Sequence, residues 1–211
     1  MSIVIPAILT KSKEVFEHQI KIIESVSELV QIDICDGEFV PDKTFDLSAL
    51  KEVVTSARYD FHLMVKNPGQ VIEQLYDLPN INRILFHIEQ VQFPTAEIEH
   101  IHGYGHGAWI AVNPETSLED IEGYLYQADG VLFLAVHPGK QGQVLLPEVL
   151  EKIKQCKIKH PTVRVGIDGG VKKEHIAELK AIGVDEICVG SAVFAAPDPA
   201  VAFKELQEMA R

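Results

Sequence analysis

The sequence predicts one α/β domain over residues 1–211, a (β/α)8 TIM barrel whose eight parallel strands close on themselves. Three observations predict it: eight short runs rich in β-branched and aromatic residues, stretches of helical spacing between them, and no glycine-rich loop after the first run. Strands that alternate with helices are typical of a parallel sheet. The 211 residues allow about 26 for each of eight units, near the lower limit for such a barrel.

Each strand is expected where apolar side chains form a short run bounded by polar or turn-forming residues. In chain order these runs are 3–8, 29–34, 59–64, 81–88, 108–112, 131–136, 163–167 and 186–189. Helices are expected between them, where apolar residues recur every three or four positions, as at Phe16, Ile20 and Ile23 and at Ile176, Leu179 and Ile182. Helix starts are predicted at Ser12, at Asp46 and at Thr116, where Glu119 completes a capping-box pattern.

The main competing fold is a doubly wound open sheet. That fold carries a glycine-rich phosphate loop directly after its first strand. Here the first run ends in Pro6-Ala7-Ile8-Leu9, which has no glycine. The closed barrel is therefore the better prediction.

Composition narrows the class of protein. Apolar residues make up 46% and charged residues 24%, as in soluble globular domains, and no uncharged apolar run approaches the ~20 residues of a membrane span. The opening apolar stretch is too short for a secretory signal and lacks a basic leader. A net charge of −12 argues against a nucleic-acid-binding surface. The three cysteines, Cys35, Cys156 and Cys188, have no metal-binding spacing, so a reduced, cytoplasmic protein is expected.

Three chemically active side chains are predicted to converge at one end of the barrel. The carboxyl ends of barrel strands build the active site, and alternation along a strand decides which side chains point inward. Alternation places Gln31, Asp33 and Cys35 on the inner face of the second strand, His62 on that of the third, and Asp168 on that of the seventh. Each residue taken alone is also compatible with a capped turn or a satisfied polar group in the core.

The two aspartates suggest a specific chemistry. Strands two and seven are expected to lie nearly opposite each other, so Asp33 and Asp168 can flank a flat substrate. Two carboxylates on opposite faces are what a two-base epimerisation needs, because one removes a proton and the other delivers one. A divalent metal held by both aspartates and His62 would stabilise the enediolate.

Glycine-rich turns at the same end predict a phosphate site. The seventh strand runs into Gly169 and Gly170, the eighth into Gly190 and Ser191, and a further glycine-containing loop at 138–143 follows the sixth. Backbone N–H groups exposed in the loops after strands seven and eight form the usual phosphate site of such barrels. Ordinary tight turns are the alternative reading.

From Ile3 to about Phe194 the sequence shows motifs of a known family. The chain resembles the ribulose-phosphate 3-epimerase family. The likeness rests on Pro6-Ala7-Ile8-Leu9, Asp33-Ile34-Cys35-Asp36-Gly37-Glu38-Phe39-Val40-Pro41, His62-Leu63-Met64, Val112-Asn113-Pro114, Pro138-Gly139 with Gly142-Gln143, Ile167-Asp168-Gly169-Gly170 and Gly190-Ser191-Ala192. It implies a TIM barrel of the ribulose-phosphate-binding type that interconverts ribulose 5-phosphate and xylulose 5-phosphate in the pentose phosphate pathway.

The resemblance also implies roles for residues. Asp33 and Asp168 would be the acid/base pair and metal ligands, and His62 a third ligand to a divalent cation (Zn, Fe, Mn or Co). Substrate binding would fall to Ala7, His62, Met64, Gly139, Lys140, Gln141, Gly142, Gly169, Gly170, Gly190 and Ser191. The expected partner is a small sugar phosphate, with no nucleic acid or membrane, and a homo-oligomer is expected because barrels of this kind often form one.

The chain departs from the family pattern within this pocket. Gln31 stands at a fourth ligand position, where the family carries a metal-binding His, and a glutamine carbonyl replaces imidazole poorly for zinc or iron. Ala7 stands in place of a substrate-contacting Ser and Cys35 in place of a Met, while Lys140-Gln141 replace a Phe-Gly pair. These changes leave open a non-catalytic sugar-phosphate-binding barrel, or an epimerase for another ketose phosphate. A lyase or decarboxylase of the same superfamily ranks last, because the second strand lacks the expected Asp-x-Lys pair.

The sequence contains other histidines that are candidates for sites. His100, His102 and His106 lack acidic or cysteine partners at ligand spacing, so a solvated segment before the fifth strand is expected. His137 closes the sixth strand, and contact with substrate or metal is a hypothesis for it. Asp36, just beyond the second strand, is expected to hold its turn through the side chain.

Overall fold

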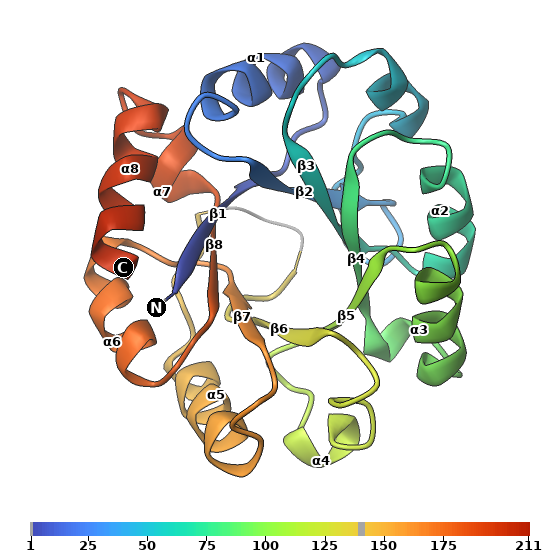
Figure 1. Cartoon of the computed structure of the whole chain (residues 1–211), viewed down its shortest axis with the longest axis vertical. Helices are drawn as coiled ribbons and strands as arrows, with labels where there is room; N and C mark the ends of the chain where they lie inside the picture. Colours follow the sequence, from blue (N-terminus) through green and yellow to red (C-terminus); the bar gives the residue numbers. More distant parts are fainter. Residues whose placement is uncertain (1, 139–141) are drawn as a thin grey trace.

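The computed structural model describes residues 2–138 and 142–211 and shows the predicted closed barrel. The strands follow one another around the ring in chain order, each parallel to its neighbours, and the last pairs with the first (Figure 1). They are β1 (Ile3–Ile8), β2 (Leu29–Cys35), β3 (Arg58–Met64), β4 (Ile81–His87), β5 (Gly107–Val112), β6 (Gly130–Leu134), β7 (Val165–Asp168) and β8 (Glu186–Val189).

Helices surround this ring. The α-helices are α1 (Lys13–Ile23), α2 (Pro68–Leu75), α3 (Pro94–Gly103), α4 (Leu118–Ile121), α5 (Pro147–Lys159), α6 (Ile176–Ala181), α7 (Ser191–Phe194) and α8 (Pro199–Ala210). Short 3-10 helices, η1 (Leu47–Glu52), η2 (Ile88–Gln90) and η3 (Lys173–His175), occur in the connections. Within the described ranges, no helix is both long enough and apolar enough to cross a membrane.

The predicted helix starts are largely confirmed. The Ser12 side chain accepts a hydrogen bond from the Val15 N–H and caps α1. Asp46 likewise caps the second connection, which is a 3-10 helix. The capping box predicted from Thr116 lies one residue later, with Ser117 and Asp120 bonded reciprocally. Both registers satisfy the same sequence pattern, and the Thr116 hydroxyl donates to Glu89 instead.

The core has two layers separated by the barrel wall. Outward-facing strand residues pack against the helices, while a smaller cluster that includes Ile5, Leu85 and Trp109 fills the barrel interior. The Trp109 ring fits because β6 and β7 carry glycine beside it, at Gly130 and Gly166. A Cβ at Gly130 would lie 2.6 Å from the indole ring, and one at Gly166 would lie 3.3 Å from it.

A buried ion-pair network lies inside the barrel, toward the amino-terminal ends of the strands. The Arg83 guanidinium donates to Asp60 at 2.6 Å and to Glu186, and it lies 4.0 Å above the centre of a Trp109 ring. Arg164 donates to the other Glu186 oxygen at 2.6 Å. These partners compensate charges that would otherwise be costly to bury. This network fills the amino-terminal end of the barrel, and the opposite end contains a cavity.

Candidate active site

A cavity of about 550 Å³, including its open mouth, lies at the carboxyl-terminal ends of the strands. The predicted site residues that line it are Ala7, Asp33, His62, Met64, Gly142, Asp168, Gly169, Gly170, Gly190 and Ser191. Leu9, Leu134, Val136, Pro138, Val171 and Cys188 complete the lining. Gly139, Lys140 and Gln141 were also predicted here and lie outside the described residues.

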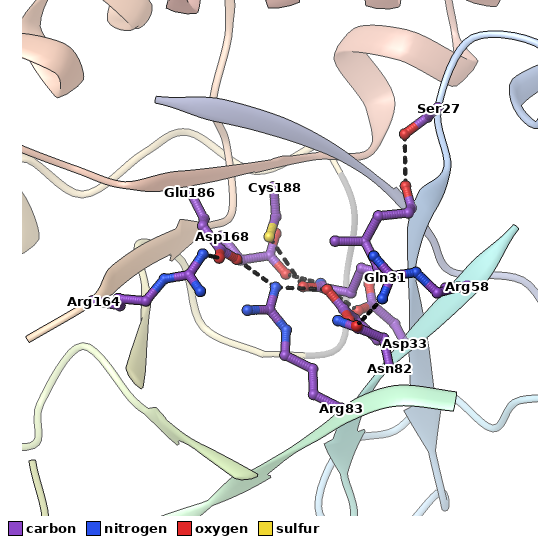
Figure 2. Close-up of polar contacts among 12 residues, drawn as sticks. Ser27, Gln31, Asp33, Arg58, Asn82, Arg83, Arg164, Asp168, Glu186 and Cys188 are labelled. Atoms are coloured by element: carbon purple, nitrogen blue, oxygen red, sulfur yellow. Dashed lines mark hydrogen bonds and ion pairs between the residues drawn. The ribbon is translucent and has the colours of Figure 1, made fainter. Parts of the chain in front are cut away.

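The Gln31 side chain bridges Asp33 and Asp168 by hydrogen bonds. The Gln31 Nε2 donates to Asp33 Oδ1 at 2.9 Å and to Asp168 Oδ2 at 2.6 Å (Figure 2). On its other side, the Cys188 thiol donates to Gln31 Oε1 at 3.0 Å. Strands β2 and β7 are three places apart around the ring, separated by β1 and β8, rather than opposite each other. Both side chains nevertheless reach the same cavity because they point toward the barrel axis.

His62 joins the pair from β3. Its Nδ1 lies 3.0 Å from Asp33 Oδ1 and 3.6 Å from Asp168 Oδ2, and its side chain is almost fully buried. Burial by itself would lower the pKa of His62. The hydrogen bond and charge of Asp33, together with the charge of Asp168, outweigh that effect and raise the pKa above its ordinary value.

The Asp168 carboxyl group binds a proton more tightly in this site than it would in water. Burial and the nearby negative charge of Asp33 raise the pKa of Asp168 to about 6, although His62 and the Gln31 amide act in the opposite direction. A carboxyl group poised near neutral pH can both take up and release a proton under cellular conditions.

The same three residues could hold a divalent cation. One ligand atom each from Asp33, His62 and Asp168 lie within 4.8 Å of one another, and they form the one group of this kind in the described part of the chain. Two carboxylate oxygens and an imidazole nitrogen suit a divalent ion, and catalytic metal sites often use three protein ligands. The donor set therefore fits a metal, with Gln31 presenting N–H groups rather than its carbonyl oxygen to the carboxylates.

Behind His62 lies a hydrogen-bond chain that the sequence reasoning missed. His62 Nε2 lies 3.2 Å from His87 Nε2, and His87 Nδ1 lies 3.3 Å from Glu89 Oε2. Glu89 also accepts from the backbone N–H of Asn113 at 2.8 Å and from the Thr116 hydroxyl. When His87 Nδ1–H donates to Glu89, His87 Nε2 accepts from His62 Nε2–H. His62 Nδ1 then carries a hydrogen while it donates to the ionised Asp33, and it would offer a lone pair to a cation only after releasing that hydrogen.

The sequence signal for these hydrogen bonds is the His-x-Glu pattern at the end of the fourth strand. His137, for which a substrate or metal contact was the hypothesis, has its side chain outside the cavity lining and pairs with Glu115 at 3.0 Å. His100 and His102 belong to α3 and His106 follows it, so the expected solvated segment is mostly helical. His102 pairs with Asp129 at 2.9 Å.

The wall formed by the loop after β7 requires glycine. Gly169 and Gly170 have φ angles of 107° and 68°, in the region that L side chains rarely adopt. A Cβ at Gly169 would lie 2.4 Å from Val136 Cγ2, and one at Gly170 would lie 2.4 Å from the Leu145 backbone nitrogen. After the adjacent strand β8, Gly190 precedes α7 and Ser191 begins it, and both residues line the same cavity.

Asp36 organises the loop after β2, as predicted. Its Oδ1 accepts from the N–H groups of Glu38 at 2.8 Å and Phe39 at 2.9 Å, and its Oδ2 accepts from the Lys66 N–H at 2.7 Å. Burial opposes ionisation, but these three backbone donors outweigh it and lower the pKa of Asp36. The ordered loop places the centroid of the Phe39 ring 4.8 Å from the centroid of the His87 ring.

Cys35 is buried and packs with Val40 and Met64. Its backbone N–H donates to the Thr44 hydroxyl at 2.8 Å. The cavity lining includes Met64 but does not include Cys35.

The chain matches a known protein family over most of its length. Residues 3–194 match the model of the "Ribulose-phosphate 3 epimerase family". The chain is 32% identical over 216 residues to a ribulose-phosphate 3-epimerase of Aquifex aeolicus (strain VF5), covering 99% of this chain and 97% of that protein. It is 36% identical over 203 residues to a ribulose-phosphate 3-epimerase of Helicobacter pylori (strain J99), covering 92% and 93%.

Solved structures with low sequence identity share the architecture. The crystal structure of a 3-hexulose-6-phosphate synthase superposes with a TM-score of 0.76 at 16% identity, covering 100% of both chains. An orotidine 5'-phosphate decarboxylase from Pyrococcus horikoshii OT3 gives a TM-score of 0.70 at 14% identity, covering 99% of both chains. At these identities the likeness shows the barrel fold alone.

Proposed function

This chain belongs to the ribulose-phosphate 3-epimerase family and is an isomerase-class enzyme, and on that premise we propose that it interconverts ribulose 5-phosphate and xylulose 5-phosphate. The observation that carries the proposal is the convergence of Asp33 and Asp168 on one cavity, both bonded to the same Gln31 nitrogen. Two carboxyl groups that share a site are driven to different protonation states, because two neighbouring negative charges repel. Such a pair supplies one base and one acid.

The reaction needs this division of labour. The C3 hydrogen of the sugar is acidic because it lies next to the C2 carbonyl, so one carboxylate removes it and leaves an enediolate. The other aspartic acid then delivers a proton to the opposite face of C3, which inverts the configuration. The raised pKa of Asp168, about 6, allows that residue to change between the two roles near neutral pH.

A divalent cation held by Asp33, His62 and Asp168 would stabilise negative charge that develops on the sugar oxygens. The buried chain from His62 through His87 to Glu89 supports this assignment, because it fixes which His62 nitrogen faces the cavity. His62 itself lies within hydrogen-bond distance of Asp33 and can steady that carboxylate.

The phosphate group is proposed to bind against Gly169, Gly170, Gly190 and Ser191. These residues line the side of the cavity formed by the loops after β7 and β8. Loops after strands seven and eight are the usual phosphate site in this fold, since their backbone N–H groups face the ligand. Substrate roles for Gly139, Lys140 and Gln141 remain predictions.

A second candidate function is supported by Ala7. This residue lines the cavity with a methyl group, which offers no hydrogen bond to a sugar hydroxyl. The site could therefore bind or epimerise another ketose phosphate. We also expect a homo-oligomer in a reducing, cytoplasmic compartment; the free and buried state of Cys35, Cys156 and Cys188 supports the latter.

The test is turnover of ribulose 5-phosphate by purified protein, first stripped of metal and then supplied with Zn²⁺, Fe²⁺, Mn²⁺ or Co²⁺. Asp33→Asn and Asp168→Asn should each lower kcat by about 10²–10⁴-fold, the usual contribution of general acid–base catalysis. Asp77→Asn, on a side chain that is 82% exposed, is the matched control and should keep full activity. Sugar-phosphate binding without turnover under every metal condition would replace the epimerase assignment with the second candidate.

A further inference from the structure

The Gln31 side chain is fixed from both ends in the barrel interior. It is fully buried, its Nε2 bridges Asp33 Oδ1 and Asp168 Oδ2 at 2.9 Å and 2.6 Å, and its Oε1 accepts from the Cys188 thiol at 3.0 Å. Figure 2 shows the Gln31, Asp33, Asp168 and Cys188 side chains lying close together. Every polar atom of the amide thus has a partner of the matching type.

The partners decide which way the amide faces. Ionised carboxylate oxygens only accept hydrogen bonds, and the thiol hydrogen needs an acceptor. Turning the amide by half a rotation would place its oxygen against both carboxylates and its NH2 group against the thiol hydrogen. The partners therefore hold Gln31 as a donor toward the two aspartates, with its own lone pairs directed away from them.

This orientation affects any cation that binds there. The amide hydrogens bond Asp33 Oδ1 and Asp168 Oδ2. These are also the carboxylate oxygens that lie 3.0 Å and 3.6 Å from His62 Nδ1, so they are the ones placed to share a cation with that nitrogen. Gln31 therefore competes with a cation for those oxygens, and it does not add a fourth ligand. It also draws the two carboxylates together when no cation is bound, because one NH2 group satisfies both.

We propose that Gln31, held in this orientation by Cys188, sets the metal preference of the site. The inference rests on the proposed function, since it concerns the cation that would assist the same two aspartates. The protein then offers a cation two oxygen ligands and one nitrogen ligand. This set of three binds more weakly than a set of four would, and it suits an exchangeable, oxygen-preferring cation such as Mn²⁺. A nitrogen ligand at position 31 would shift the preference toward Zn²⁺.

The test measures metal affinity directly. Protein treated with EDTA and dialysed is titrated with Mn²⁺ or Zn²⁺ by calorimetry, or in competition with a chromophoric chelator. Gln31→His should increase the affinity for Zn²⁺ by at least about tenfold more than the affinity for Mn²⁺. Gln31→Met, which has a similar shape and no amide hydrogens, should increase the affinity for both cations. Thermal melts establish that each variant is folded.

Cys188 supplies a matched pair of variants. Cys188→Ala removes the donor that holds Gln31 Oε1, so the amide can turn and the affinity for both cations should rise. Cys188→Ser keeps an O–H donor and should stay close to the wild-type affinity. Equal affinities in these two variants would overturn the role of Cys188 in holding the amide.

The role of Gln31 is overturned if Gln31→His leaves the ratio of Zn²⁺ to Mn²⁺ affinity unchanged, or if Gln31→Met binds neither cation more tightly. Failure of the proposed function is read separately, as absent turnover of ribulose 5-phosphate in wild-type protein that binds metal. If none of the proteins binds either cation, the inference and the assignment of a metal both fail, and turnover alone then decides the epimerase activity.

Discussion

Asp168 should make the folded protein less stable as pH rises from about 4 to about 6. The pKa of this carboxyl is about 6 in the folded protein and 3.8 in its ordinary state, with burial and the charge of Asp33 as the main causes. Between these values the folded state holds a proton that the unfolded chain has released. The free energy of unfolding therefore falls with pH, and each pKa unit corresponds to about 1.4 kcal/mol. The full difference is about 3 kcal/mol.

Asp168→Asn removes this titration and keeps an oxygen that can accept from Gln31. The variant should gain about 3 kcal/mol relative to the wild type between about pH 4 and pH 7, while losing epimerase activity. Urea unfolding of both proteins in EDTA at these two pH values measures the gain. Such a trade of stability for function is common where an active site holds a charge in an unfavourable environment.

Asp36→Asn provides a control of opposite sign. The pKa of Asp36 is lowered, because three backbone N–H groups outweigh the effect of burial, so its stabilisation is present above the unfolded pKa and is lost as pH falls. This variant should lose stability near pH 7.5, and the loss should become smaller as pH falls below the ordinary pKa of the carboxyl. A difference between Asp168→Asn and wild type that does not vary with pH would refute the reasoning about Asp168.

Three further substitutions test other parts of the structure. Gly170→Ala should destabilise the fold by more than about 2 kcal/mol and raise KM for the sugar phosphate, because its Cβ would lie 2.4 Å from the Leu145 backbone nitrogen; unfolding and steady-state kinetics measure both. His87→Leu should weaken metal binding by about 10–100-fold, whereas His87→Gln, which can still accept from His62, should recover most of it in the same titration. Arg83→Met should cost about 3–5 kcal/mol in urea unfolding, because it leaves the buried Asp60 carboxylate without its cation and Glu186 with Arg164 alone.

The convergence of Asp33, His62 and Asp168 was predictable from sequence. Alternation along a strand fixes which side chains face inward, and the carboxyl ends of parallel strands meet at one end of the barrel. Long-range packing is not needed for that inference. The glycines at 169 and 170 were predictable for a similar reason, since a tight turn between strand and helix restricts the backbone locally.

The contact between His62 and His87 was not predictable, because it depends on strand register. The pairing of β3 with β4 shifts by one residue between Tyr59 and Asp60, so His62 pairs with Leu85. Without the shift His62 would pair with Ile84, and the residues on the inner face of β4 would be exchanged for those on its outer face. Apolar residues occupy both faces of β4, so the sequence does not reveal which face points inward.

The orientation of Gln31 was equally inaccessible. It depends on a thiol that lies 157 residues away in the chain, on β8. The sequence indicated that position 31 faces the site, but the direction of an amide is set by its partners. Gln31 therefore appeared as a poor fourth ligand, whereas the structure shows a donor to both carboxylates.

The most direct test of the two-base mechanism is exchange of the C3 hydrogen in D₂O, followed by NMR for each epimer separately. Wild-type enzyme should incorporate deuterium at C3 of both ribulose 5-phosphate and xylulose 5-phosphate. Asp33→Asn and Asp168→Asn should each epimerise far more slowly than the wild type. Each should still exchange the C3 hydrogen of one epimer, and the two variants should act on opposite epimers. Exchange of the same epimer by both variants, or epimerisation by either one at the wild-type rate, would contradict the assignment of Asp33 and Asp168 as the two bases.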